Sequence, residues 1–84
     1  MLVYELEDAI WETEGVQIVI RASRNEETNL TYDYERACSG NTTLANFRRG
    51  RLSDLGESYE YEVIDGDNET PNGRTKLSTI RDSY

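Results

Sequence analysis

The clearest alternation of apolar and polar positions runs from Ser58 to Asp65. Its residues are, in order, Ser58, Tyr59, Glu60, Tyr61, Glu62, Val63, Ile64 and Asp65. A period of two that uses aromatic and β-branched residues is typical of a half-buried β-strand. One face of this strand is apolar and the other is mainly carboxylate. We therefore expect the rest of the chain to pack against the apolar face.

The same alternation predicts further strands. They are expected at Leu2 to Glu7, at Ile10 to Thr13, at Val16 to Ala22 and at Leu30 to Glu35. Glu14-Gly15 stands between the second and third of these segments, and a two-residue connection with Gly in second place favours a tight hairpin. Trp11 is expected to close one end of the core, where its indole N–H needs a partner.

Two segments have the period of a helix instead. The apolar residues Leu44, Phe47, Leu52 and Leu55 fall on one helical stripe, with Asn41 or Thr42 as the N-cap. Gly50 lies inside this segment and favours a break or kink, and Gly56 is a natural stop. Leu77, Ile80 and Tyr84 predict a short helix at the carboxyl end.

These elements predict one compact α+β domain over residues 1–84. Its architecture is an antiparallel sheet of about four strands, with one main helix near 42–55 and a short C-terminal helix. A chain of 84 residues buries only somewhat more than about 60% of its unfolded surface, so we expect a thin core.

The chain is strongly acidic, with 17 Asp and Glu against 9 Lys and Arg and a net charge of −8. Residues 57–73 contain acids and no base. Such a chain is repelled by nucleic acid and by anionic membranes and is attracted to basic protein surfaces. The one basic cluster consists of Arg48, Arg49 and Arg51. It either neutralises the protein's own acids on a solvated helix face or contacts an acidic partner or nucleic acid, and the sequence leaves both roles open.

Several kinds of chemistry lack the residues they need. The chain has no histidine and a single cysteine, Cys38, so it has neither the commonest general base nor a zinc ligand set. Residues 65–76 do not match a calcium-binding loop, because the sixth position is Thr70 in place of Gly and the twelfth is Lys76 in place of Glu. No phosphate-binding glycine motif occurs. We therefore predict a non-enzymatic protein without metal or cofactor. The lone cysteine, the absence of a signal peptide and the absence of a long apolar run favour the cytoplasm.

The acidic strand faces are the strongest candidate for a binding surface. Carboxylates two residues apart on a strand are separated by about 6.7 Å, whereas DNA carries one phosphate per about 3.4 Å on each strand. One β-strand alone is therefore too sparse to imitate DNA, but several strands and the 65–69 loop together approach its charge density. The predicted partner-binding residues are Glu60, Glu62, Asp65, Asp67, Glu69, Asp33 and Glu35. The alternative is that these acids only keep a small domain soluble.

In length, net charge and the acid–tyrosine segments at residues 31–35 and 57–67, the chain resembles the small acidic anti-CRISPR proteins of bacteriophages. That class shares no common fold or motif. The resemblance implies a non-catalytic inhibitor that binds an RNA-guided surveillance complex and occupies the basic surface where target DNA or its PAM would lie.

Two other functions remain open. One is a small phage structural or complex-assembly subunit that uses an apolar interface around Trp11 and Tyr84. The other is a hydrolase that uses a carboxylate pair, for which no nucleophile, base and orienting group can be assembled from the sequence.

Overall fold

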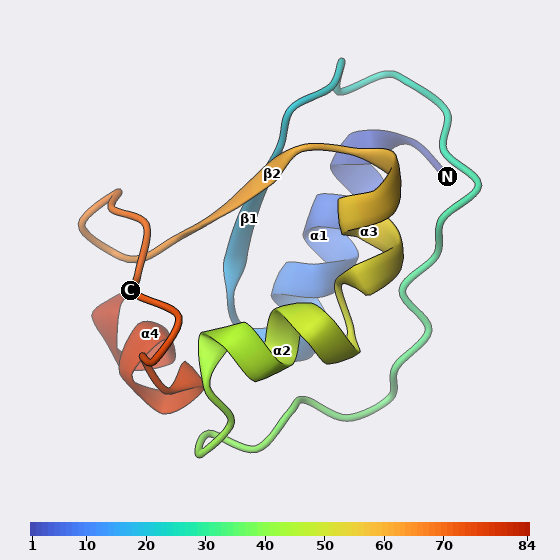
Figure 1. The fold of residues 1–84 in the computed structure, drawn as a ribbon. Coiled ribbons are helices and arrows are strands. Elements are labelled where there is room, and N and C mark those ends of the chain that lie inside the picture. Colours follow the sequence, from blue (N-terminus) through green and yellow to red (C-terminus); the bar gives the residue numbers. More distant parts are fainter.

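A computed structural model describes all 84 residues, and it contains four helices and two strands (Figure 1). The elements are α1 (Val3–Glu14), β1 (Gln17–Ile20), α2 (Leu44–Gly50), α3 (Ser53–Ser58), β2 (Tyr61–Ile64) and α4 (Leu77–Ser83). The α+β class is as expected, but the sheet of about four strands with one main helix is wrong. None of the helices is both long and apolar enough to cross a membrane.

The sheet is a single antiparallel pair in which Ile18 is opposite Val63 and Ile20 is opposite Tyr61. The strand predicted within residues 58–65 is therefore present, although it spans only the four residues of β2. At the end of the pair, the hydroxyl of Tyr84 accepts a hydrogen bond from the N–H of Gln17 at 2.8 Å and donates one to the carbonyl of Ile64 at 2.5 Å. The last residue of the chain thus joins the two strands.

The strands expected at residues 2–7 and 10–13 are absent, because residues 3–14 form helix α1 and Leu2 is its N-cap. Val3, Leu6 and Ile10 are buried, and their spacing of three and four is that of one helical face. The alternation of Leu2, Tyr4 and Leu6 fits a strand equally well over this short segment. The helix is distinguished only by the apolar spacing that continues to Ile10. Gly15 has a left-handed backbone with φ of 68° and its N–H bonds the Trp11 carbonyl, so it ends α1 and does not form a hairpin turn.

The helix expected near 42–55 is interrupted after Gly50, where α2 ends and α3 begins three residues later. Its N-cap is Thr43, whose hydroxyl accepts from the N–H of Asn46, and not Asn41 or Thr42. Gly56 lies inside α3 and does not end it. The C-terminal helix is present as α4.

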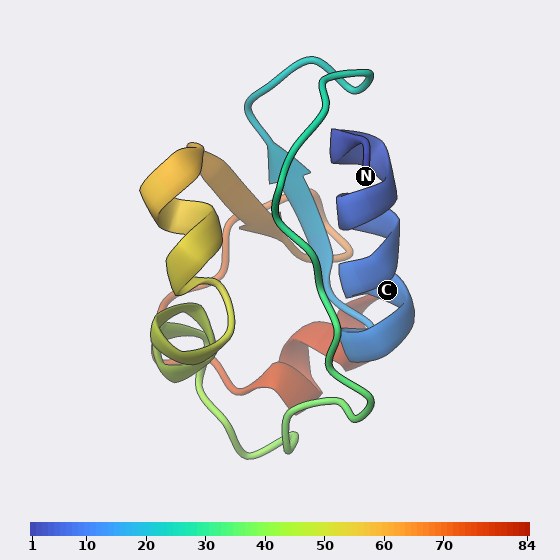
Figure 2. The ribbon, with the colours of Figure 1, turned by 90° about the vertical axis from the view of Figure 1, so that its right-hand side faces the viewer.

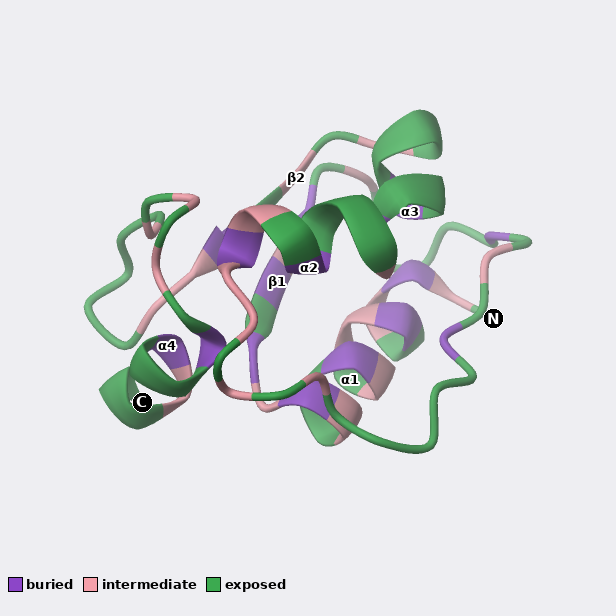
Figure 3. Cartoon of the chain, turned by 60° about the horizontal axis from the view of Figure 1, so that its bottom comes forward, coloured by how far each residue is buried: buried purple, intermediate pink, exposed green.

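The core is enclosed by the strands, by α1 and by the α2–α3 pair, with α4 closing one end (Figure 2). Figure 3 shows that α1, α2 and β1 each contain buried residues, and these residues belong to one hydrophobic cluster. Trp11 is not part of it, because 45% of its surface is exposed. It packs edge-on against Tyr84, with ring centroids 5.0 Å apart.

The segment between β1 and α2 crosses the side of the core that faces away from the strands (Figures 1 and 2). The strand expected at Leu30 to Glu35 is absent there, since no neighbouring strand is available for pairing. Side chains hold the segment instead. Tyr32 is buried, and the guanidinium of Arg51 lies 4.2 Å from the ring centroid of Tyr34.

Glu14, at the end of α1, is the residue to which this segment is attached. Its side chain is fully buried. Its carboxylate is 2.5 Å from Arg51 and 3.3 Å from Arg81, and it accepts hydrogen bonds from the Tyr32 hydroxyl at 2.6 Å and the Cys38 N–H at 2.8 Å. One carboxylate thus joins four separate parts of the chain. Cys38 is half-buried against the core.

Tyr32 must stay protonated to donate this hydrogen bond. Burial and the adjacent carboxylate of Glu14 raise the pKa of the Tyr32 hydroxyl far above its ordinary value, against the opposing effect of Arg51. The neutral phenol is therefore the form that the fold requires.

We predict that Glu14→Gln lowers the free energy of unfolding by about 3 to 5 kcal/mol, because Arg51 and Arg81 lose the charge that compensates their partial burial. Urea denaturation followed by circular dichroism measures the change. Glu12→Gln, at an exposed position of the same helix, is the matched control and should change the value by less than about 0.5 kcal/mol. A similar small loss for Glu14→Gln would contradict the role given to it.

A second prediction concerns alkaline pH. In the unfolded chain tyrosine ionises near pH about 10, whereas the folded chain holds the Tyr32 proton, so stability should fall as the pH rises above that value. Tyr32→Phe should cost about 1 kcal/mol at neutral pH and should reduce this alkaline loss. Tyr34→Phe, which removes an exposed hydroxyl, should leave the alkaline loss unchanged. Denaturation midpoints measured across the alkaline range provide the comparison.

A third prediction contrasts two glycines. A Cβ at Gly66 would overlap the carbonyl oxygen of Ser83, so Gly66→Ala should displace the C-terminus and destabilise the fold by about 1 to 3 kcal/mol. A Cβ at Gly50 meets no atom within 4 Å, so Gly50→Ala should stabilise the fold by up to about 1 kcal/mol. Thermal unfolding of both variants tests this, and equal effects would contradict it.

Candidate binding surface

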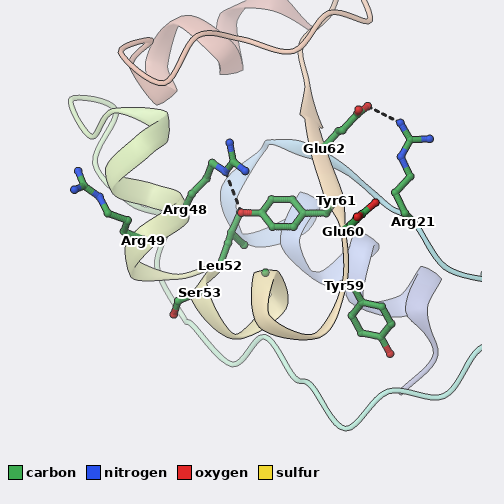
Figure 4. A pocket seen from close by; sticks show the side chains of 10 residues that line it. Arg21, Arg48, Arg49, Leu52, Ser53, Tyr59, Glu60, Tyr61 and Glu62 are labelled. Atoms are coloured by element: carbon green, nitrogen blue, oxygen red, sulfur yellow. Dashed lines mark hydrogen bonds and ion pairs between the residues drawn. The ribbon is translucent and has the colours of Figure 1, made fainter.

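The largest concavity of the molecule is an open groove of about 650 Å³ between the α2–α3 pair and β2 (Figure 4). On the helical side it is lined by Arg48, Arg49, Leu52, Ser53 and Gly56. On the strand side it is lined by Arg21, Tyr59, Glu60, Tyr61 and Glu62. We call it the arginine groove. It brings two of the predicted partner-binding residues, Glu60 and Glu62, together with two arginines of the basic cluster.

Tyr61 holds Arg48 in the groove. The Nε–H of Arg48 donates to the Tyr61 hydroxyl at 3.1 Å, and the guanidinium carbon lies 5.2 Å from the centroid of the same ring. Such a contact between a cation and a ring face orients the guanidinium plane. Arg49 donates to the side-chain oxygen of Asn46 at 2.5 Å. Arg51, the third arginine of the cluster, is separate from the groove and belongs to the Glu14 contacts.

The opposite wall carries two acids, Glu62 in β2 and Glu60 immediately before it. Glu62 pairs with Arg21 at 2.9 Å, and both side chains are about half exposed, so the pair contributes at most about 1 kcal/mol. Glu60 is exposed and forms no ion pair. These two carboxylates remain accessible to a partner.

Three predicted residues follow β2 in the loop at residues 65–69. One carboxylate oxygen of Asp65 accepts hydrogen bonds from the N–H groups of Asp67 and Glu69, at 2.9 and 3.1 Å. Asp65 therefore shapes the loop, whereas the side chains of Asp67 and Glu69 are exposed. We call the exposed set Glu60, Glu62, Asp67 and Glu69 the acidic ribbon.

Asp33 and Glu35 do not join the acidic ribbon. They are exposed residues of the segment between β1 and α2. That segment runs along the side of the molecule away from β2 and its loop (Figures 1 and 2). Asp33 accepts a hydrogen bond from the Thr31 hydroxyl at 2.7 Å. The seven predicted residues thus form two separate groups.

Two further titratable side chains, Cys38 and Tyr84, are partly buried. Burial and the charge of Glu14 raise the pKa of the Cys38 thiol, which disfavours the reactive thiolate. Burial also raises the pKa of Tyr84, whose hydroxyl joins the two strands. No group of three or more His, Cys, Asp or Glu side chains lies close enough together to hold a metal ion.

Sequence reasoning did not identify the arginine groove or the role of Glu14. Arg48 and Tyr61 are 13 residues apart, and neither belongs to a motif. A glutamate followed by glycine looked like a turn, and no local signal distinguished a buried carboxylate from the chain's many exposed ones.

Comparisons with known proteins do not add an assignment to this geometry: a scan against protein-family models, a search of curated proteins and a search of solved structures each found no match.

Proposed function

We propose that this chain is a non-enzymatic inhibitor that binds a basic nucleic-acid-binding surface of a CRISPR surveillance complex and blocks recognition of target DNA or its PAM. It acts in the cytoplasm of the host cell, without a cofactor. The contact surface is the acidic ribbon, and its exposed carboxylates take the place of DNA phosphates.

The observation that carries this proposal is the uncompensated charge of the ribbon. The chain has four ion pairs, and only that of Arg21 with Glu62 involves an acid of residues 57–73. Glu60, Asp67 and Glu69 are exposed without a basic partner. Like charges held on one short strand and its loop repel one another, so a basic partner surface that approaches them gains favourable electrostatic energy.

The alternative is a small phage structural or complex-assembly subunit. It is favoured by the aromatic pair of Trp11 and Tyr84, which are 45% and 42% exposed. Exposed aromatic side chains are common at the centre of protein interfaces. A contact made there would resist salt, whereas one made by the acidic ribbon would weaken steeply as ionic strength rises.

We predict that the chain reduces the binding of labelled target duplex to a purified surveillance complex, and that added salt weakens this inhibition. Replacing the four ribbon acids by Lys should lower the affinity at least about tenfold, because each exposed ion pair contributes about 0.2 to 1 kcal/mol and each reversal adds repulsion. Competition titrations with the duplex measure the effect.

A charge-matched control reverses four exposed acids elsewhere, namely Asp8, Glu12, Glu35 and Asp82. This control should retain most of the inhibition if position matters as well as net charge. Full inhibition by the ribbon variant would rule out the acidic ribbon as the contact surface. A salt-resistant complex lost in Trp11→Ala would instead support the assembly subunit.

A further inference from the structure

Two arginines of the arginine groove have no carboxylate partner, although the chain contains 17 acids. The four ion pairs use the amino terminus, Arg21, Arg51 and Arg81. Arg48 and Arg49 are exposed and bond only neutral oxygens, those of Tyr61 and Asn46. Their positive charge is therefore available to a ligand.

Arg48 is the better placed of the two. Its Nε–H donates to the Tyr61 hydroxyl and its guanidinium carbon lies over the Tyr61 ring, while its terminal nitrogens form no hydrogen bond within the chain. Figure 4 shows the guanidinium beside the tyrosine ring at the groove. An oriented guanidinium loses less side-chain entropy on binding, and its planar donors match the two oxygens of a carboxylate or the oxygens of a phosphate.

The opposite wall decides between these anions. Glu60 and Glu62 line the same groove, and the whole chain has a net charge of −8. The two glutamates and the overall charge therefore repel the continuous phosphates of a nucleic acid. A peptide segment can carry both signs of charge. Successive side chains of an extended segment point in opposite directions, and alternate ones are about 6.7 Å apart. In a basic–acidic–basic triplet, the acid can face Arg48 while the two bases face Glu60 and Glu62. Glu62 then exchanges its half-exposed contact with Arg21 for the base of the peptide.

We propose that the arginine groove binds an extended peptide segment of a partner protein, in which one Asp or Glu pairs with Arg48 and the flanking Lys or Arg side chains pair with Glu60 and Glu62. This inference rests on the proposed function in one respect, since Glu60 and Glu62 also belong to the acidic ribbon. It adds that the partner's basic surface includes an acid, which fixes the position of the contact.

The test uses two synthetic peptides with blocked ends, Thr-Lys-Asp-Lys-Thr and Thr-Lys-Asn-Lys-Thr, titrated into the intact chain and followed by NMR. We expect shifts of the Arg48 Nε–H signal and of the Tyr61 ring. We also expect the Asp peptide to bind more tightly by up to about fivefold, the upper value for one exposed ion pair. Arg48→Gln should remove this preference.

Arg24→Gln is the matched control. Arg24 is also exposed and also lies over a tyrosine ring, that of Tyr4, at 5.6 Å, but it is outside the groove. This variant should keep the preference for the Asp peptide unchanged. Equal binding of the two peptides by the unmodified chain, an unchanged preference in Arg48→Gln, or no binding of either peptide would overturn the inference.

The two proposals fail in different ways. If Glu60→Gln with Glu62→Gln weakens both peptides equally while Arg48→Gln has no effect, the acidic contact stands and the role of Arg48 is wrong. If the peptides bind as expected but no surveillance complex is inhibited, the groove specificity stands and the proposed target is wrong.

Discussion

The fold depends on one buried carboxylate. Removing Glu14 from water costs several kcal/mol of free energy, and only several simultaneous partners can compensate that cost. Arg51, Arg81, Tyr32 and the N–H of Cys38 provide them. These partners come from the end of α2, from α4 and from the segment that crosses the core. In a chain with 14 buried apolar residues and a two-stranded sheet, this polar centre fixes elements that apolar packing alone holds weakly.

The Glu14 contacts also account for the separation of the three neighbouring arginines into different roles. Arg51 turns inward at the break between α2 and α3, whereas Arg48 and Arg49, on the last turn of α2, remain at the surface. The break after Gly50 thus directs one guanidinium to the core and leaves two for the groove. Residues of both helices line the arginine groove beside β2.

Mixed charge is the feature that connects the two proposals. An acidic surface alone gives attraction to a basic partner and fast association, but it does not specify where on that partner the contact forms. An oriented arginine within the acidic surface adds a position that repels an ill-matched base and favours an acid. Selectivity of this kind comes from the penalty for a wrong pairing as much as from the attraction of a right one.

The sequence by itself determined the α+β class, the strand at β2, the helical stripes of α2 and α4, and the net acidity of residues 57–73, because each depends on local periodicity or on composition. Gly50 within the helical stripe also favoured the break that the structure shows between α2 and α3. Only the tertiary structure decided that residues 3–7 are helical, because two periods fit that short segment and burial of Val3 and Ile10 selects one. Likewise, residues 30–35 alternate like a strand but have no strand beside them. The partners of Glu14 and the pairing of Arg48 with Tyr61 are contacts between distant segments, and no local pattern encodes such contacts.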